Sequence, residues 1–429
     1  MRIILCLLAI CFIHFSIGAP LGRENDSDIK LNKGEVLYDG DIVLTKDQQS
    51  ALEGSTRTKR SVGLLAFKWP NDVVNYYYDN NMKKEHIKYM EAAFEYIRSK
   101  TCINFINDGK PFNSLRITGK GGCASYVGFQ YLGEQKLWYG PGYGCPLMLG
   151  TAVHELMHAL GIVHEQSRFD RDQYLTINEG VVSWTTKHNI AMQLSYNLTP
   201  FEYGSTMLYP MDALGTGSIR PKNEDYKYTM GNFKVSFYDM VKINKQYGCA
   251  KKCITQLKCK NGGYTNPANC NVCNCPNGYE GALCDQLPKE RVTHTANKTW
   301  TTHWVNFGDS SGKTLINPDY SYIVITAPAG KTIEVQITKL TNFSCSRGCR
   351  DNGVEVKFNG DPRITNPILC CNHELDSTRT YKSKQNPTII SLYTFRGNSK
   401  VTYRFRYIDE DFTLGPKTTN GYDSYEYYK

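Results

Sequence analysis

Beyond residue 17 the sequence lacks any apolar run that approaches 18 uninterrupted residues, so no membrane-spanning helix is expected there. It also lacks an arginine-rich stripe or a nucleic-acid-binding motif behind its formal charge of +9. We therefore interpret that charge as solvated surface with a loose affinity for acidic matrix, and we expect no nucleic-acid partner. No acidic cluster precedes Cys253, so nothing indicates calcium binding at that point.

What is present at the start of the chain predicts export. A charged first pair, an apolar run over residues 3–17 and small residues at Gly18 and Ala19 are typical of a signal peptide over residues 1–18. A signal anchor is the alternative, but basic flanks after the run are weak. We expect a secreted, extracellular protein without stable membrane insertion. Sequons at Asn197, Asn297 and Asn342 are then candidate glycosylation sites.

The cysteine count agrees with an oxidising compartment. Two of the sixteen cysteines, Cys6 and Cys11, belong to the expected leader, and the remaining fourteen are an even number that can form disulfides.

The most informative motif is HELMHALGIVH at residues 154–164. On an α-helix, residues four apart share one face, so His154 and His158 can bind one metal ion together. Glu155 lies beside them, where its carboxylate can polarise a water molecule. Gly161 permits a chain reversal that returns His164 as a third nitrogen ligand. A surface helix that carries histidines by coincidence is the alternative, but the offsets of Gly161 and His164 favour a metalloprotease signature.

The continuation of this motif resembles a known family. Residues 164–172, HEQSRFDRD, resemble the HExxRxDRD run of the astacin zinc peptidases, and residues 205–209, STMLY, are similar to their SxMxY Met-turn. The resemblance implies one Zn²⁺ per catalytic domain, with His154, His158, His164, a water molecule and Tyr209 as its ligands.

The resemblance also implies a role for each neighbour of the metal. Glu155 would be the general base, Tyr209 would swing away from the zinc to stabilise the transition state, and Met207 would form an apolar floor below the ligands. Ordinary core packing is the alternative for Met207 and Tyr209 taken alone. Leu208 departs from the family pattern, which commonly has histidine at this position.

The segment over residues 19–60 contains no cysteine and ends in Arg57-Thr58-Lys59-Arg60. This R-x-K-R run resembles a furin-type site, so we expect a propeptide that a furin-like processing protease cleaves between Arg60 and Ser61. A chance basic cluster is the alternative.

Within that segment, Tyr38-Asp39-Gly40-Asp41 resembles the astacin FxGD element, whose aspartate binds the zinc and blocks it. Asp41 is therefore expected to be the latency ligand, with an ordinary Asp-Gly turn as the alternative. In astacins the amino terminus that cleavage creates, here Ser61, meets the glutamate that follows the third zinc-binding histidine. That residue is Glu165, for which an exposed surface position is the alternative.

For residues 61–250 we expect an α+β, metzincin-type catalytic domain with an active-site cleft. β-Branched and aromatic runs predict strands over residues 73–78, 114–118 and 123–129. Apolar residues at 87, 90, 94 and 97 predict an amphipathic helix with Asn81 as a candidate N-cap. The zinc helix is expected to begin near Pro146 and end at Gly161. Residues 122–126 match the astacin edge strand that receives substrate. An exposed edge can do so because its unpaired backbone groups can pair with an extended peptide.

Four cysteines fall in this domain, and residues alone allow three pairings. The resemblance implies the pairs Cys102–Cys249 and Cys123–Cys145.

Residues 251–286 hold six cysteines and are too short for a core of their own, so disulfides must hold them. They resemble an EGF-like domain, which implies Cys253–Cys270, Cys259–Cys273 and Cys275–Cys284. The close spacing of Cys270 and Cys273 leaves the first two pairs open, and a zinc-binding module is the alternative.

Residues 288–409 alternate between polar and apolar side chains in short runs, which predicts a β-sandwich. The pattern ITAPAGKTIEVQI at residues 325–337 and the last four cysteines resemble a CUB domain that lacks the usual early cysteine. We propose Cys345–Cys371 and Cys349–Cys370, with the other pairing equally open. Residues 410–429 are expected to be a flexible tail.

The sequence as a whole predicts a secreted zinc endopeptidase that acts on extracellular proteins or peptides and is made as a zymogen activated after Arg60. The domain order is similar to that of nematode astacins, and the EGF-like and CUB-like modules are expected to contact matrix partners. The alternative is a catalytically silent binding protein that acts through these two modules. The intact histidines and Glu155 favour the enzyme.

Overall fold

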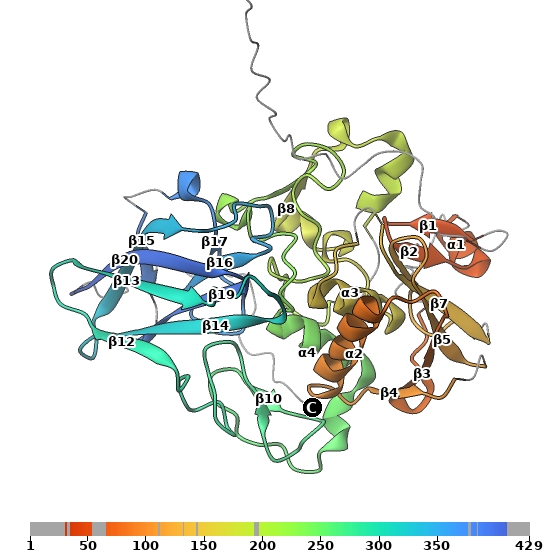
Figure 1. Ribbon diagram of the computed structural model, residues 1–429, viewed down its shortest axis with the longest axis horizontal. Helices are drawn as coiled ribbons and strands as arrows, with labels where there is room; N and C mark the ends of the chain where they lie inside the picture. Colours follow the sequence, from red (N-terminus) through yellow and green to blue (C-terminus); the bar gives the residue numbers. More distant parts are fainter. Residues whose placement is uncertain are drawn as a thin grey trace, which may run out of the picture.

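The computed structural model describes residues 31, 35–53, 66–109, 112–131, 133–142, 145–192, 197–375, 379–383 and 385–409. The expected signal peptide (1–18), processing site (Arg60 and Ser61) and tail (410–429) lie outside these residues. Figure 1 shows three parts, which we name the peptidase unit (66–252), the small disulfide unit (253–286) and the β-sandwich (291–408). Among the described residues, no helix has both the length and the apolar character needed to cross a membrane.

The peptidase unit is built on a seven-stranded sheet that also includes two strands from residues before position 60. Its order is β1-β2-β6-β7-β5-β3-β4. The strands are β1 (Val36–Tyr38), β2 (Ile42–Leu44), β3 (Val73–Tyr78), β4 (Asn104–Asn107), β5 (Ser114–Thr118), β6 (Cys123–Tyr126) and β7 (Glu134–Tyr139). A separate antiparallel pair joins β8 (Leu175–Ile177) to β9 (Ile219–Pro221).

Among the described residues, four α-helices accompany the sheet: α1 (Lys46–Glu53), α2 (Lys84–Arg98), α3 (Leu149–Ala159) and α4 (Phe237–Tyr247). Short 3-10 helices lie at Pro70–Asp72, Glu165–Ser167, Arg171–Gln173, Glu179–Val181, Trp184–Ile190, Glu224–Tyr226 and Cys249–Lys252. Helix α2 packs against α3, and the spacing of Met90, Phe94 and Ile97 places all three in one buried core with Leu156 of α3.

The structure corrects three details of the sequence prediction. Asn81 does not cap α2: its side-chain oxygen accepts a hydrogen bond from the backbone N–H of Gly119 at 2.6 Å, and the cap position is Lys83. Helix α3 begins at Leu149 because Met148, just before it, has an extended backbone. Strand β6 ends at Tyr126 because Gly128 has a φ of +72° and leads the chain away from the sheet.

The β-sandwich has one five-stranded and one four-stranded sheet, with orders β12-β14-β19-β16-β17 and β13-β20-β15-β18. The first contains β12 (Arg291–Thr295), β14 (Thr314–Thr326), β19 (Thr388–Arg396), β16 (Asn352–Lys357) and β17 (Ile368–Leu369). The second contains β13 (Thr301–Gly308), β20 (Asn398–Ile408), β15 (Thr332–Thr341) and β18 (Tyr381–Ser383), and a 3-10 turn covers Asn372–Glu374. Alternate residues such as Ile323 and Ile325 fill the core between the sheets.

The small disulfide unit has only one antiparallel pair, β10 (Tyr264–Thr265) and β11 (Cys273–Asn274). Disulfides supply the rest of its order. The seven disulfides are Cys102–Cys249, Cys123–Cys145, Cys253–Cys270, Cys259–Cys273, Cys275–Cys284, Cys345–Cys371 and Cys349–Cys370. These pairs coincide with those named from the sequence.

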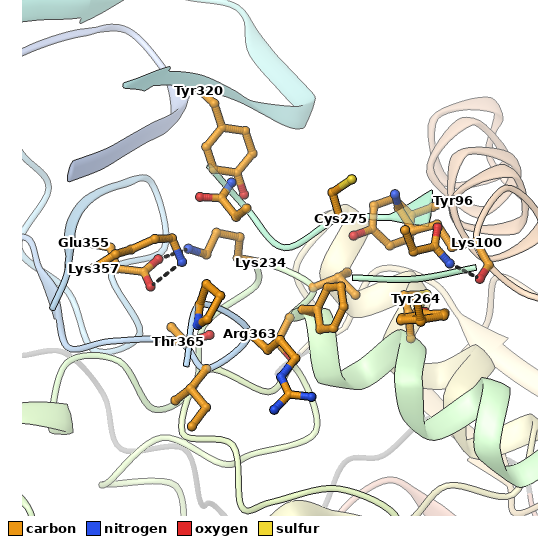
Figure 2. Close-up of a pocket in the computed structure, with 18 residues that line it drawn as sticks. Tyr96, Lys100, Lys234, Tyr264, Cys275, Tyr320, Glu355, Lys357, Arg363 and Thr365 are labelled. Carbon is orange, nitrogen blue, oxygen red and sulfur yellow. Dashed lines mark hydrogen bonds and ion pairs between the residues drawn. The ribbon is translucent and has the colours of Figure 1, made fainter. Parts of the chain in front are cut away.

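The three parts meet around a cavity of about 260 Å³. Figure 2 shows that Lys234 of the peptidase unit and Lys357 of the β-sandwich both reach the Glu355 carboxylate; the N···O distances are 3.3 and 3.2 Å. Burial raises the pKa of the Glu355 carboxyl, but the two lysines outweigh burial and lower the pKa to about 2. The buried charge cluster therefore joins the β-sandwich to the peptidase unit. The small disulfide unit is joined to the peptidase unit by a hydrogen bond in which the Asn274 side chain donates to the Lys100 carbonyl at 2.9 Å.

A second part of this junction depends on close backbone approach. A Cβ added to Gly348 of the β-sandwich would collide with the carbonyl oxygen of Gly231 in the peptidase unit, and the φ of Gly348 is +80°. Gly330 has almost the same φ, +77°, but open space around its Cβ position.

We expect Gly348→Ala to destabilise the protein by about 2 kcal/mol more than Gly330→Ala, because both variants strain the backbone and only the first overpacks the junction. Chemical unfolding of the two variants in parallel, followed by tryptophan fluorescence, provides the measurement. Equal losses of stability would show that the junction tolerates a side chain at Gly348.

Candidate metal centre

Two local features bring three histidines together. His154 and His158 lie four residues apart on α3 and so share one face of the helix. After the helix ends at Ala159, Gly161 takes a φ of +95°, which few residues other than glycine adopt. The chain then turns back and places His164 opposite the helix.

The three imidazoles converge on one point. The Nε2 atoms of His154 and His158 are 3.1 Å apart, those of His158 and His164 are 3.2 Å apart, and those of His164 and His154 are 3.3 Å apart. Asp41 adds a carboxylate, with oxygens 3.2 Å from His164 Nε2 and 3.3 Å from His154 Nε2. His158 and His164 are fully buried.

The other ring nitrogens face acceptors. His154 Nδ1 is 2.8 Å from the carbonyl oxygen of Thr206, and His158 Nδ1 is 2.8 Å from that of Ile162. His164 Nδ1 lies 2.9 Å from Asp39 Oδ2. Carbonyl oxygens only accept, so they hold the protons of His154 and His158 on Nδ1, and the Nε2 lone pairs of these two rings face the common point.

This arrangement fits a zinc ion. Four tetrahedral ligands at about 2.0–2.1 Å from a metal lie roughly 3.3 Å from one another, which is the spacing of the Nε2 atoms. Nitrogen and carboxylate donors are also the ligands that zinc prefers.

The electrostatics require a positive charge at the same place. Burial lowers the pKa of His164, but the carboxylates of Asp41 and Asp39 outweigh burial and raise the pKa to about 10. The neighbouring His158 behaves oppositely: burial lowers its pKa to about 4. A metal ion bound among the three histidines would supply the positive charge that the Asp41 and Asp39 carboxylates otherwise draw from a proton on His164.

Glu155 projects into the cleft beside this point. It is buried, and its Oε2 atom has no hydrogen-bond partner among the described residues. Burial, and then the negative charge of Asp41, raises the pKa of Glu155 well above its usual range. A carboxyl group with a raised pKa next to a metal position can exchange protons near neutral pH.

Met207 and Tyr209 lie below and beside the histidines. Met207 is fully buried in the core that also contains Leu156 and Met157 of α3. The Tyr209 ring lies 4.7 Å from the His164 ring, and its hydroxyl donates to the backbone carbonyl of Asp39 at 2.6 Å. Tyr209 therefore contacts the segment before position 60 in this structure.

That segment occupies the edge of the peptidase sheet. Strand β2 pairs in parallel with β6, and Ser125 donates its backbone N–H to the Asp41 carbonyl at 2.9 Å. Gly40 turns the chain between β1 and β2, and a Cβ there would collide with the Tyr209 hydroxyl. Residues 36–44 thus cover both the metal position and the strand edge expected to receive substrate.

Glu165 is buried rather than exposed. Its carboxylate receives Lys242 Nζ at 2.7 Å, Arg168 Nη1 at 3.1 Å and the backbone N–H of Glu202 at 2.9 Å. Ser61, its expected partner, lies outside the described residues. Among the candidate glycosylation sites, Asn297 and Asn342 are exposed, and Asn197 is half-buried.

A cavity of about 650 Å³ extends from Asp41, His154 and Glu155. Its described lining includes residues of the N-terminal segment, α3, the Met-turn, the segments at 142–146 and 186–189, the loop at residues 231–233 and Arg350 of the β-sandwich. The cavity is therefore a cleft that an extended chain can enter beside the metal position.

Sequence reasoning missed several residues of this centre. Asp39 belongs to the same short motif as Asp41, so a second carboxylate next to a histidine-rich site was a usable signal. No signal in the sequence marked Lys242 or Arg350, because a lone lysine or arginine is usually solvated. Only the fold brings Lys242 to Glu165 and Arg350 to the cleft.

Three comparisons relate this geometry to known proteins. Residues 63–248 match the model of the Astacin peptidase family. The chain is 45% identical over 428 residues to zinc metalloproteinase nas-17 of Caenorhabditis elegans, covering 98% of each chain. It is 42% identical to zinc metalloproteinase nas-16 of the same nematode, covering 88% of this chain and 86% of that protein. The hatching enzyme HCE-1 of the medaka Oryzias latipes is 32% identical over 43% of this chain and 94% of its own, with a TM-score of 0.39.

We expect the purified chain to contain one zinc ion and His158→Ala to lose most of it, because two nitrogens and one carboxylate form an incomplete ligand set. Asp41→Ala should retain zinc, since three histidines remain. Elemental analysis by mass spectrometry measures the metal content, and His303→Ala in the β-sandwich is the matched control. Full zinc occupancy in His158→Ala would place the metal elsewhere.

Proposed function

The chain belongs to the astacin family of peptidases and is a zinc metalloendopeptidase; we propose that it is secreted and remains latent until it is cleaved after Arg60. Its substrates are proteins or peptides, and we propose that these are extracellular. The observation that carries the proposal is the cleft in which Glu155 lies beside three convergent histidines.

We propose the following division of roles. When bound by His154, His158 and His164, zinc supplies a Lewis acid that polarises the scissile carbonyl and acidifies water. Glu155 accepts the proton of the attacking water and passes it to the leaving amine. The Tyr209 hydroxyl, once free of Asp39, donates a hydrogen bond to the oxyanion. Met207 supports the ligands from the core.

Latency follows from what residues 36–44 cover. We propose that Asp41 fills the fourth ligand position while β2 occupies the edge of β6. Asp39 adds a contact to His164 Nδ1, and its carbonyl accepts the Tyr209 hydroxyl, which keeps that tyrosine from its catalytic position. The propeptide would therefore block three things at once: the fourth ligand position of the metal, the catalytic position of Tyr209 and the strand edge that receives substrate.

Release of the propeptide creates an amino terminus at Ser61. We propose that it approaches Glu165, whose carboxylate already balances Lys242 and Arg168. A buried ammonium group is stable only beside a compensating carboxylate, so this pairing is specific to the cleaved chain.

The remaining assignments complete the proposal. They are a signal peptide at 1–18, a propeptide at 19–60, a catalytic domain at 61–250, an EGF-like domain at 251–286, a CUB-like domain at 288–409 and a tail at 410–429. Seven disulfides support an oxidising, extracellular destination. We further propose a furin-like activating protease, glycans at Asn197, Asn297 and Asn342, and matrix partners for the last two domains.

Glu155→Gln in the activated enzyme should retain zinc and lower kcat by roughly 100-fold or more, because the amide cannot accept a proton. Cleavage of a fluorogenic peptide gives kcat, and zinc content gives the control for ligand geometry. Turnover close to that of the unaltered enzyme would refute the assignment of Glu155 as the base.

A proform with Arg57, Lys59 and Arg60 changed to alanine should be secreted and inactive. The same proform with Asp41→Ala should regain part of its activity as a full-length chain, since the fourth ligand position is free while the Ser61 terminus is still absent. Peptide hydrolysis and electrophoretic mass are measured together. An uncleaved proform that is already fully active would contradict the role of Asp41.

A further inference from the structure

The two sheets of the β-sandwich have different surroundings. The five-stranded sheet faces the peptidase unit, because Glu355 of β16 pairs with Lys234 and the backbone N–H of Ile368 in β17 donates to the Thr229 hydroxyl at 2.9 Å. In Figure 1 the labelled strands β13, β15 and β20 of the four-stranded sheet lie on the side of the β-sandwich away from α3 and α4. Trp304 of β13 is 59% exposed, so solvent reaches the outer face of this sheet.

That outer face is strongly basic. Alternate residues of β20 fill the core, so the residues between them point outward together with their partners on β15 and β18. The described charged residues that point outward are five cations, Lys339, Lys382, Lys400, Arg404 and Arg406, and one carboxylate, Glu334. Glu334 accepts Arg406 at 2.7 Å, whereas Lys339, Lys400 and Arg404 form no ion pair among the described residues. We call these six side chains, together with Trp300 and Trp304, the basic face.

Two tryptophans hold cations of the basic face in place. The guanidinium Cζ atoms of Arg404 and Arg406 lie 5.0 and 4.7 Å from the centre of the Trp300 ring. Lys400 Nζ lies 4.0 Å from the centre of the Trp304 ring. A cation–π contact orients a cation without neutralising its charge. These groups therefore lose less conformational freedom when they bind an anion than mobile surface side chains do.

The dimensions of the basic face favour a polymer over a small anion. Six residues separate Lys400 from Arg406, so along β20 the charges extend over about 20 Å. The backbone of β20 is already paired with β13 on one side and β15 on the other, which leaves no edge for an extended peptide to join here. A ligand must then be recognised by side chains alone, through negative groups repeated along its length.

We propose that the basic face binds a sulfated polysaccharide of the extracellular matrix. The inference rests on the proposed secretion of the enzyme and names the chemical class of its proposed matrix partner. Arginine donates paired hydrogen bonds to oxyanions, and the exposed Trp304 ring offers a flat apolar surface to the C–H face of a sugar ring. An acidic protein would use the same charges but does not require an exposed tryptophan. None of these residues lines the cleft, so a bound polymer need not cover the metal centre.

The test measures binding of a fluorescently labelled heparin oligosaccharide to the full-length activated enzyme by anisotropy. Changing Lys339, Lys400 and Arg404 to glutamine should raise Kd roughly tenfold or more, because three charge contacts are lost. The ion pair of Arg406 with Glu334 stays intact in this variant. The matched control changes Lys84, Lys88 and Lys120, three exposed lysines of the peptidase unit, to glutamine and should alter Kd by less than about twofold.

Two further variants separate recognition from folding. Arg404 Nε donates to Gln336 at 2.6 Å, so its loss could disturb the sheet. Changing only Lys339 and Lys400 removes no hydrogen bond between described side chains, and this variant should still raise Kd several-fold. Trp304→Ala leaves the charge unchanged and should also weaken binding of the oligosaccharide. Thermal unfolding followed by circular dichroism shows whether each variant is folded.

Competition identifies the class of ligand. Poly-glutamate should displace the oligosaccharide only at much higher concentration of negative charge, and the desulfated oligosaccharide should not displace it. Equal competition by poly-glutamate, with no effect of Trp304→Ala, would make the basic face a site for acidic proteins and overturn the proposal. Unchanged Kd in the folded triple variant would overturn it as well. Failure of the proposed function would appear separately, as a chain that is retained in the cells that make it or that hydrolyses no peptide, whatever its affinity for heparin.

Discussion

Three imidazole nitrogens whose lone pairs face one buried point repel one another unless a positive charge lies between them, and the peptidase unit is organised around that constraint. The Thr206 and Ile162 carbonyls orient two of the rings, so the Met-turn and the turn after α3 are part of the centre. Gly161 is needed because its φ of +95° returns His164 to the helix. The stability of this region and its capacity to bind zinc therefore have a common origin.

The same demand for charge explains how a short segment can oppose catalysis. A carboxylate beside the metal position is attracted by any cation bound there, so Asp41 needs few other contacts. The segment nevertheless makes several: β2 pairs with β6, and Asp39 reaches both His164 and Tyr209. Each of these groups has a proposed part in catalysis, so one displacement would free metal, tyrosine and strand edge together.

Local pattern was sufficient for some features and not for others. The fourfold spacing of His154 and His158, the alternation in β3 and the periodicity of α2 each depend on residues within one element, and the structure contains those elements close to the expected bounds. The unused Asn81 cap was missed because Gly119, distant in sequence, binds its side chain, and the end of β6 was missed because a single glycine, Gly128, decides it. The start of α3 was missed because Met148 has an extended backbone that the pattern of residues does not show. The ion pair of Lys242 with Glu165 joins residues 77 positions apart, and no local signal marks such a contact.

The β-sandwich contributes to the cleft because it packs directly against the peptidase unit and is not merely tethered to that unit by a linker. Contacts such as Lys234 with Glu355, and Gly231 against Gly348, leave no room for the two units to shift without losing buried charge pairing or opening a void. A residue of the second unit is then as well positioned as one of the first, which is why Arg350 of the β-sandwich lines the same cavity as His154 and Glu155.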